Sequence, residues 1–226
     1  MDFMDRVSYH SLFGLFGVLS LVLLLLTLPA LAEQRPENMD LNALKARATE
    51  LQKRLNQNPS DGEALRSLGI VYYAAALKDS KAYTNRAILY LEQAYQKKPE
   101  DAEVLCCLGT TYTLLAKNTS DLSSITSNMN KGIGFMDKAV RMDPDNISVR
   151  MIRANNSKNL PKFLNRRSVA YEDFEHLASL FEKNPDISPL LKASVYQNLA
   201  TLYKEDGDAA KAQRYEAMAA TIKKEK

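Results

Sequence analysis

The sequence predicts an all-α protein built from antiparallel helix hairpins, and three observations support this. The composition has no Trp, only 8 Gly and 8 Pro, and many Ala, Leu, Lys and Glu, which favours helices over sheets. At residues 65–72 the pattern Leu-x-x-Leu-Gly-x-x-Tyr places large, small and aromatic side chains on one stripe of a helix. A pattern of the same kind returns at residues 105–112 and, with Tyr first and Ala in place of Gly, at residues 196–203.

Small residues inside these helices predict where a second helix packs. A Gly in a helix costs about 1 kcal/mol relative to Ala, so we expect Gly69 where a partner helix approaches too closely for any side chain. Ala87 and Ala94 recur at helical spacing on the next segment and allow that approach, and Pro99 ends the segment. The small residues expected at helix contacts are Gly69, Ala87, Gly109, Gly132, Ala139, Ala200 and Ala212.

The spacing of these residues resembles that of the tetratricopeptide repeat (TPR) family. In the last copy, Tyr196, Leu199, Ala200 and Tyr203 follow the family spacing without any insertion. The resemblance extends over about residues 61–224. It implies a short right-handed α-solenoid of about three to four helix pairs, with a concave groove that binds other proteins.

The chain divides into a leader, a linker, one extra helix and four repeats. Apolar residues at steps of three and four predict that the extra helix is amphipathic and packs on the first hairpin; pairing with a second copy of the chain is the alternative. The expected segments are 1–32 (leader), 33–40 (linker), 41–57 (N-terminal helix), 61–99 (repeat 1), 101–144 (repeat 2), 146–185 (degenerate repeat 3) and 188–224 (repeat 4).

Residues 1–32 are expected to be a secretory signal peptide or an N-terminal membrane anchor. Residues 12–28 are almost wholly apolar, and Ala30 and Ala32 occupy the small-residue positions of a cleavage site. The weak positive flank and the length of the apolar run leave an uncleaved anchor open. Both alternatives predict an exported protein in the periplasm or cell envelope of a bacterium.

Repeat 2 carries a polar insertion at residues 117–130. Ser, Thr and Asn dominate this stretch, and they favour caps and turns over helix interiors. The insertion is therefore expected to be a mobile loop or, alternatively, a contact for a specific partner.

Repeat 3 departs from the pattern because Arg150 and Arg153 take inward positions. Buried arginines are costly unless they are paired and hydrogen-bonded. The family geometry would place Asp173 opposite Arg153, which predicts a structural ion pair. Capture of an acidic partner by a groove-facing arginine is the alternative.

The residue patterns predict that the chain is not an enzyme and holds no cofactor or metal. Beyond the leader the only histidine is His176, and nothing near it fits a Ser–His or Cys–His pair. Cys106 and Cys107 are expected to be buried small hydrophobes, with a reactive or intermolecular thiol as the alternative. A net charge of +3 is too small to indicate nucleic-acid binding.

The TPR resemblance implies which residues would line a binding groove, because that family forms it mainly from the first helix of each pair. In this sequence the corresponding positions are Arg66, Ile70, Tyr73, Cys106, Thr110, Thr113, Met151, Asn155, Lys158, Gln197, Thr201 and Lys204. The Lys/Asn/Arg set with which similar chaperone-binding members hold a C-terminal carboxylate is absent, which disfavours a receptor for chaperone tails.

The sequence therefore predicts a non-catalytic scaffold or adaptor of the cell envelope that binds a segment of another protein. The alternative is a structural protein that assembles with copies of itself through its end helices. Neither hypothesis involves nucleic acid, and contact with a membrane is expected only through residues 1–32 if these are not cleaved.

Overall fold

The computed structural model of the chain describes residues 35–224. The signal peptide or anchor expected at residues 1–32 lies outside the described residues. Within residues 35–224 the chain forms nine α-helices and two short 3-10 helices, which confirms the all-α prediction. The elements are η1 (Pro36–Asn38), α2 (Leu41–Gln57), α3 (Gly62–Lys78), α4 (Ser80–Lys97), α5 (Ala102–Lys117), α6 (Leu122–Met142), α7 (Ile147–Asn159), η2 (Lys162–Leu164), α8 (Arg167–Lys183), α9 (Pro189–Glu205) and α10 (Ala209–Lys224).

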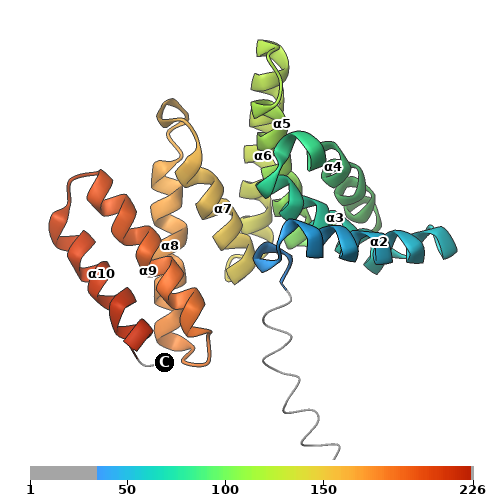
Figure 1. The fold of residues 1–226 in the computed structure, drawn as a ribbon. Helices are drawn as coiled ribbons and strands as arrows, with labels where there is room; N and C mark the ends of the chain where they lie inside the picture. Colours follow the sequence, from blue (N-terminus) through green and yellow to red (C-terminus); the bar gives the residue numbers. More distant parts are fainter. Residues whose placement is uncertain (1–34, 225–226) are drawn as a thin grey trace, which may run out of the picture.

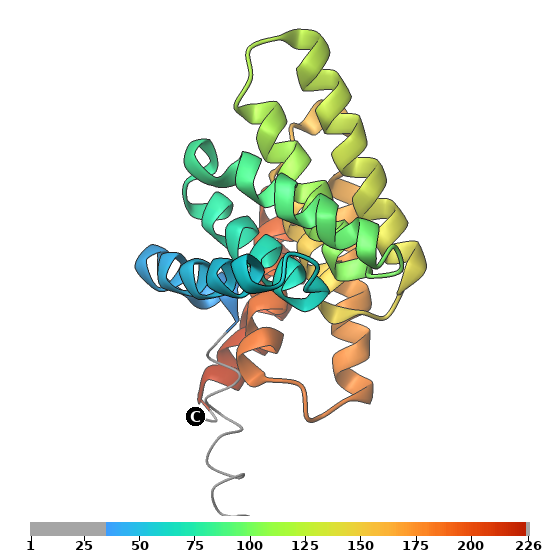
Figure 2. The same ribbon diagram turned by 90° about the vertical axis from the view of Figure 1, so that its right-hand side faces the viewer.

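Consecutive helices pair into antiparallel hairpins. Helix α3 packs with α4, α5 with α6, α7 with α8 and α9 with α10, and the extra helix α2 lies against α3. The hairpins follow one another from α2–α4 at one end of the molecule to α9–α10 at the other (Figure 1). Figure 2 shows the α5–α6 hairpin projecting beyond its neighbours.

This projection arises because α6 is longer than the sequence predicts. The helix begins at Leu122, so most of the polar insertion at residues 117–130 is helical and the loop prediction is wrong. Asp121 caps the helix by accepting a hydrogen bond from the backbone N–H of Ser124. At the inner end of the insertion, Met129 is buried. A cap and a buried anchor outweigh the low helix propensity of the polar residues between them.

The helix contacts expected at small residues are present. A Cβ added to Gly109 would lie 2.6 Å from the carbonyl oxygen of Gly132, and one added to Gly132 would lie 2.5 Å from that of Gly109. A Cβ added to Gly69 would lie 2.8 Å from Cδ2 of Leu91. The other four expected contact residues are buried: Ala87, Ala139, Ala200 and Ala212. The helices of these hairpins therefore approach more closely than larger side chains would allow.

The apolar core has two large parts, which meet at α7, and a third small cluster of Ala116, Met129 and Leu160. The larger part is formed by α2–α6 and reaches Val149 and Ile152 on α7. The smaller part is formed by α8–α10 and reaches Ala154 on the same helix. Helix α7 thus forms the seam between the two cores.

A buried ion cluster lies at this seam. Asp173 is fully buried, and its carboxylate accepts hydrogen bonds of 2.7 Å from Nη1 of Arg150 and from Nε of Arg153. Arg153 also lies 3.1 Å from Asp137 on α6. Burial alone would lower the pKa of Arg153, but its bonds to Asp173 raise the pKa above its usual value, so the guanidinium stays charged. The expected structural ion pair is present, and both arginines are used inside the fold.

Carboxylates cap most of the helices. Each capping residue accepts a hydrogen bond from the backbone N–H three residues further on: Asp40, Asp61, Asp79, Asp101, Asp121 and Asp208. Helix α7 uses the neutral Asn146 in the same way. Arg166 and Ser188 precede α8 and α9 without making a side-chain cap. Pro189 suits the first position of α9 because its missing N–H needs no partner there.

Candidate protein-binding groove

A groove of about 710 Å³ runs between η1, α2 and α3 and reaches the first residues of α5 and α7. We call it the η1 groove. Ile70 and Val71 line it and are buried, so they form its apolar floor. Met39 lines it from the residue before the cap of α2, where an apolar side chain fixes the direction in which the chain enters the helix.

One arginine at this groove is held firmly by carboxylates. Nε of Arg66 lies 2.8 Å from Asp101, and Nη2 of the same residue pairs with Glu103. Burial alone would lower the pKa of Arg66, but the two carboxylates raise it above its usual value. Arg66 therefore joins α3 to the start of α5 and is only partly available to a ligand.

Two other carboxylates at the groove are exposed. Glu37 on η1 makes no ion pair among residues 35–224. Glu50 pairs only with the exposed Arg47, at 3.3 Å on the surface of α2, and such pairs contribute little. The η1 groove thus combines an apolar floor with exposed charges of both signs, because Arg35 and Arg47 line it beside Glu37 and Glu50.

The structure brings two of the twelve predicted groove residues, Arg66 and Ile70, into this groove. Four others are core residues and cannot form an open surface: Tyr73, Cys106, Thr110 and Thr113. The reason is that α5 packs directly against α3 on one side and α7 on the other. Sγ of Cys106, for example, lies 3.4 Å from the carbonyl oxygen of Val149 on α7.

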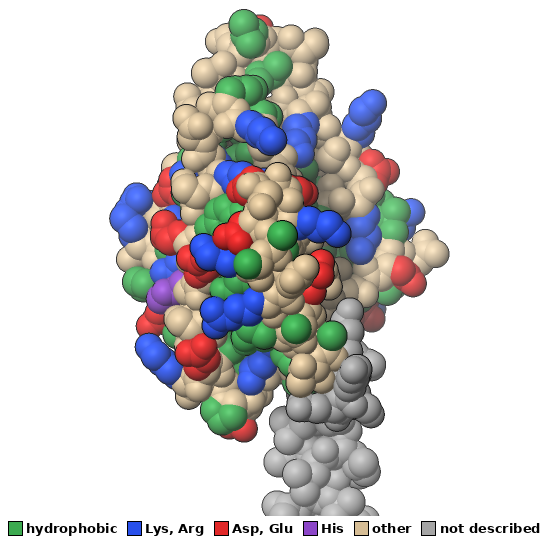
Figure 3. Space-filling model, turned by 90° about the vertical axis from the view of Figure 1, so that its left-hand side faces the viewer, with side chains coloured by type: hydrophobic (Ala, Val, Ile, Leu, Met, Phe, Trp, Pro, Cys, Tyr) green, Lys and Arg blue, Asp and Glu red, His purple; other side chains and the backbone are tan. Residues whose placement is uncertain are grey.

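The remaining six predicted residues lie on α7 and α9, and none of them lines the η1 groove. They are Met151, Asn155 and Lys158 on α7, with Gln197, Thr201 and Lys204 on α9. Nζ of Lys158 donates a 2.6 Å hydrogen bond to Asn198, which joins the two helices. On the face at the α9–α10 side of the molecule, Lys and Arg are interspersed with Asp and Glu (Figure 3). The twelve positions therefore do not form one surface.

The two cysteines are buried and unpaired. Burial raises the pKa of both thiols well above the usual value, which keeps them protonated and unreactive. Within residues 35–224 no group of three His, Cys, Asp or Glu side chains could hold a metal ion. In the same part of the chain, no helix combines the length and apolar character needed to cross a membrane.

Sequence reasoning misses the η1 groove because it assigns residues 33–40 to a linker. Two signals in that stretch indicate more order. Pro36 favours a helical turn at its first position, and Met39 is an apolar residue directly before the capping Asp40. Together they fix a short turn that packs against α3.

A comparison with protein families identifies residues 42–164, more than half of the chain, as matching the plant-specific mitochondrial import receptor subunit TOM20. The chain belongs to this family. The TOM20 family is a family of receptors without catalytic activity, which confirms the prediction that the chain is a protein-binding molecule and not an enzyme. No curated protein sequence matches the chain significantly.

The TOM20 family match corrects one prediction. The predicted location in the periplasm or cell envelope of a bacterium is wrong, because the matching family consists of subunits of the mitochondrial import receptor. The family likewise gives no support to a secretory signal at residues 1–32. The match ends at residue 164, just before α8, so it includes the larger apolar core and the seam helix α7.

Solved structures show the same TPR-like fold. The TOM20-family chain is similar to a thermophilic TPR protein, TTC0263 of Thermus thermophilus, with a TM-score of 0.60 and 20% identity over 80% of this chain and 84% of that one. It is also similar to BtubC from P. vanneervenii, with a TM-score of 0.54 and 20% identity over 82% and 73% of the two chains. MamA of MSR-1 matches with a TM-score of 0.50 and 20% identity over 82% and 92%.

Proposed function

We propose that the chain is a receptor that binds targeting segments of proteins imported into the mitochondrion, and that the η1 groove holds the segment. The TOM20 family supports the first part of this proposal. The second part depends on one observation: an apolar floor lies beside exposed carboxylates.

The chemistry of the groove suits a basic amphipathic helix. The apolar side of such a helix would cover Met39, Ile70 and Val71, as in other helix-in-groove complexes. Its Lys or Arg residues would then lie near Glu37 and Glu50, where opposite charges steer the encounter and set the orientation. Because these carboxylates are exposed, salt should weaken binding.

The test is the affinity of the full chain for a fluorescent basic amphipathic peptide of about five helical turns, which is roughly 18 residues. The variant Glu37→Lys/Glu50→Lys should bind about tenfold more weakly, a loss of about 1.4 kcal/mol. Met39→Ala should weaken binding without changing its dependence on salt, because it removes only apolar contact.

The matched control is Glu216→Lys, an exposed reversal on α10 at the other end of the molecule. It should leave the affinity unchanged. Equal binding by the control and by the Glu37→Lys/Glu50→Lys variant would remove the η1 groove from the proposal. A peptide with Gln in place of every Lys and Arg that binds as tightly as the basic one would show that the carboxylates play no part.

A further inference from the structure

We propose that a second groove, on another side of α2, binds an acidic segment of a partner protein. This groove of about 470 Å³ lies between α2, α3 and α4, and we call it the tyrosine cleft. The α2 residues that line it include Lys45, Gln52 and Lys53, none of which lines the η1 groove. The inference therefore goes beyond the proposed function and does not depend on it.

The charge of the tyrosine cleft is of one sign. Lys45, Lys53 and Arg86 line it, and no Asp or Glu does. None of these three cations forms an ion pair within residues 35–224. By contrast, Arg66 and Arg153 are each paired with carboxylates. The cleft thus presents positive charge that the fold itself leaves without a carboxylate.

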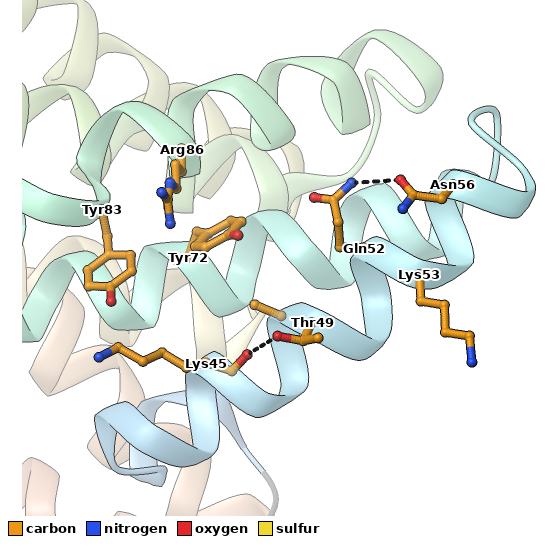
Figure 4. Close-up of a pocket in the computed structure, with 9 residues that line it drawn as sticks. Lys45, Thr49, Gln52, Lys53, Asn56, Tyr72, Tyr83 and Arg86 are labelled. Atoms are coloured by element: carbon orange, nitrogen blue, oxygen red, sulfur yellow. Dashed lines mark hydrogen bonds between the residues drawn. The ribbon is translucent and has the colours of Figure 1, made fainter.

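Aromatic rings hold the central cation in place. The guanidinium carbon of Arg86 lies 5.8 Å from the ring centre of Tyr72 and 6.0 Å from that of Tyr83. The two rings stack with their centres 6.2 Å apart. Figure 4 shows Arg86 above both rings and Lys45 reaching toward Tyr83 from α2. An arginine held by aromatic faces keeps its hydrogen-bond donors free for a carboxylate.

The spread of these cations favours an extended chain over a small anion. Lys45 and Lys53 are eight residues apart on α2, which is about 12 Å along a helix axis. Figure 4 shows that Lys53 points away from the other cations at the far end of the cleft. A phosphate-sized ligand needs donors that converge on one point. In an extended peptide, alternate side chains are about 7 Å apart, so carboxylates at every second position match the spread.

Polar side chains beside the cations suit the backbone of such a peptide. Thr49, Gln52 and Asn56 line the cleft from α2. Oε1 of Gln52 accepts a 2.7 Å hydrogen bond from the hydroxyl of Tyr90, which fixes the orientation of its amide. The amide nitrogen of Gln52 lies 3.5 Å from Asn56, at the limit of a hydrogen bond, so it remains able to donate to a peptide carbonyl.

The test is the binding of the full chain to a fluorescent ten-residue peptide with Glu at every second position and Ser between. The variant Lys45→Glu/Arg86→Glu should weaken binding at least tenfold. The matched control is Arg214→Glu, an exposed arginine that lies 6.0 Å from the ring centre of Tyr215 on α10; it should leave the affinity within twofold. A peptide with Gln at every Glu position should bind at least tenfold more weakly.

Three results would overturn the proposal. The first is equal affinity of Lys45→Glu/Arg86→Glu and the unchanged chain. The second is equal binding of the Glu and Gln peptides. The third is displacement of the peptide by inorganic phosphate at the same total negative charge, which would indicate a small-anion site.

If circular dichroism shows that the double variant does not fold, the variant Arg86→Gln answers the same question, because it keeps a planar polar group beside the tyrosines. Loss of acidic-peptide binding with retained binding of the basic peptide would separate this site from the η1 groove.

Discussion

In the hairpin α5–α6 the two helices touch through glycines, whereas in α7–α8 they are joined by a buried ion cluster. Gly109 and Gly132 leave no room for a Cβ, so backbone lies on backbone. In α7–α8 the guanidinium groups of Arg150 and Arg153 surround the carboxylate of Asp173. Both hairpins keep the antiparallel arrangement, but their interiors differ in chemistry.

The difference follows the position of each hairpin in the molecule. Helices α5 and α6 lie inside one apolar core, where close packing is favourable and any void or excess volume is costly. Helix α7 lies between two cores, and its ion cluster also reaches Asp137 on α6 and Glu172 on α8. A buried cluster adds little net stability over an apolar interior but requires one geometry. Its ion pairs join α6, α7 and α8 at the seam between the two cores.

The largest expected effect comes from removing the central carboxylate. Asp173→Ala leaves Arg150 and Arg153 buried without their partner and should lower the free energy of unfolding by about 3–5 kcal/mol, measured by urea denaturation. Replacing all three residues together by apolar ones of similar volume should restore much of this loss. Asp186→Ala, an exposed control, should change stability by less than about 0.5 kcal/mol. A comparable small change for Asp173→Ala would show that the cluster is not formed.

A smaller loss of stability is expected at the contact between Gly109 and Gly132. In Gly109→Ala the new Cβ would meet the carbonyl oxygen of Gly132, which belongs to the backbone and cannot rotate away. The helices must separate, so the free energy of unfolding should fall by about 1–3 kcal/mol. The same denaturation curve measures this, and an unchanged midpoint would mean that the two helices do not touch there.

A gain in stability is expected at Gly134, a glycine of the same hairpin that makes no contact. Nothing lies within 4 Å of a Cβ added to Gly134, which is exposed on α6. Gly134→Ala should therefore stabilise the chain by up to about 1 kcal/mol through helix propensity alone. Opposite signs for Gly134→Ala and Gly109→Ala would separate packing from propensity, whereas a loss at both positions would contradict the contact argument.

The smallest and most local signal is the reactivity of the cysteines. Burial raises the pKa of both thiols, so neither should react with a disulfide reagent at pH 8 in the folded chain. Cys106 contacts Val149 on α7. In Asp173→Ala its labelling should rise a few-fold more than that of Cys107, whereas Gly109→Ala should raise both equally. Mass spectrometry of the labelled peptides distinguishes the two patterns.

Part of this comparison could be predicted from the sequence. Residue sizes at helical spacing locate the contact between Gly109 and Gly132, because both glycines occupy the small-residue positions of the repeat. The repeat spacing also pairs Arg153 with Asp173, since antiparallel helices fix which residues are opposite. The additional bond from Arg150 to the same carboxylate depends on side-chain geometry that spacing does not determine.

Other features depend on tertiary contacts that local patterns do not contain. The polar insertion forms a helix because Met129 is buried by residues distant in sequence. Cys106 and Thr113 are buried because α7 closes the inner face, which positions transferred from the TPR family do not anticipate. The η1 groove and the tyrosine cleft both depend on where α2 lies against α3. The predicted location is wrong because apolar residues followed by small ones predict an export signal, whereas the family match covers residues 42–164 and does not depend on them.

The capping carboxylates give the chain an uneven response to acid. A hydrogen bond from the backbone N–H of Ala64 holds the pKa of Asp61 below its usual value. For Asp121 the main cause is a hydrogen bond from the side chain of Ser124, which lowers the pKa of that carboxyl in the same way. Stability from a lowered carboxyl pKa is present near neutrality and is lost as the pH falls through that pKa. Helices α3 and α6 begin with these two carboxylates, whereas the starts of α7–α9 have no capping carboxylate. Acidification should therefore fray the starts of α3 and α6, while the starts of α7–α9 stay ordered.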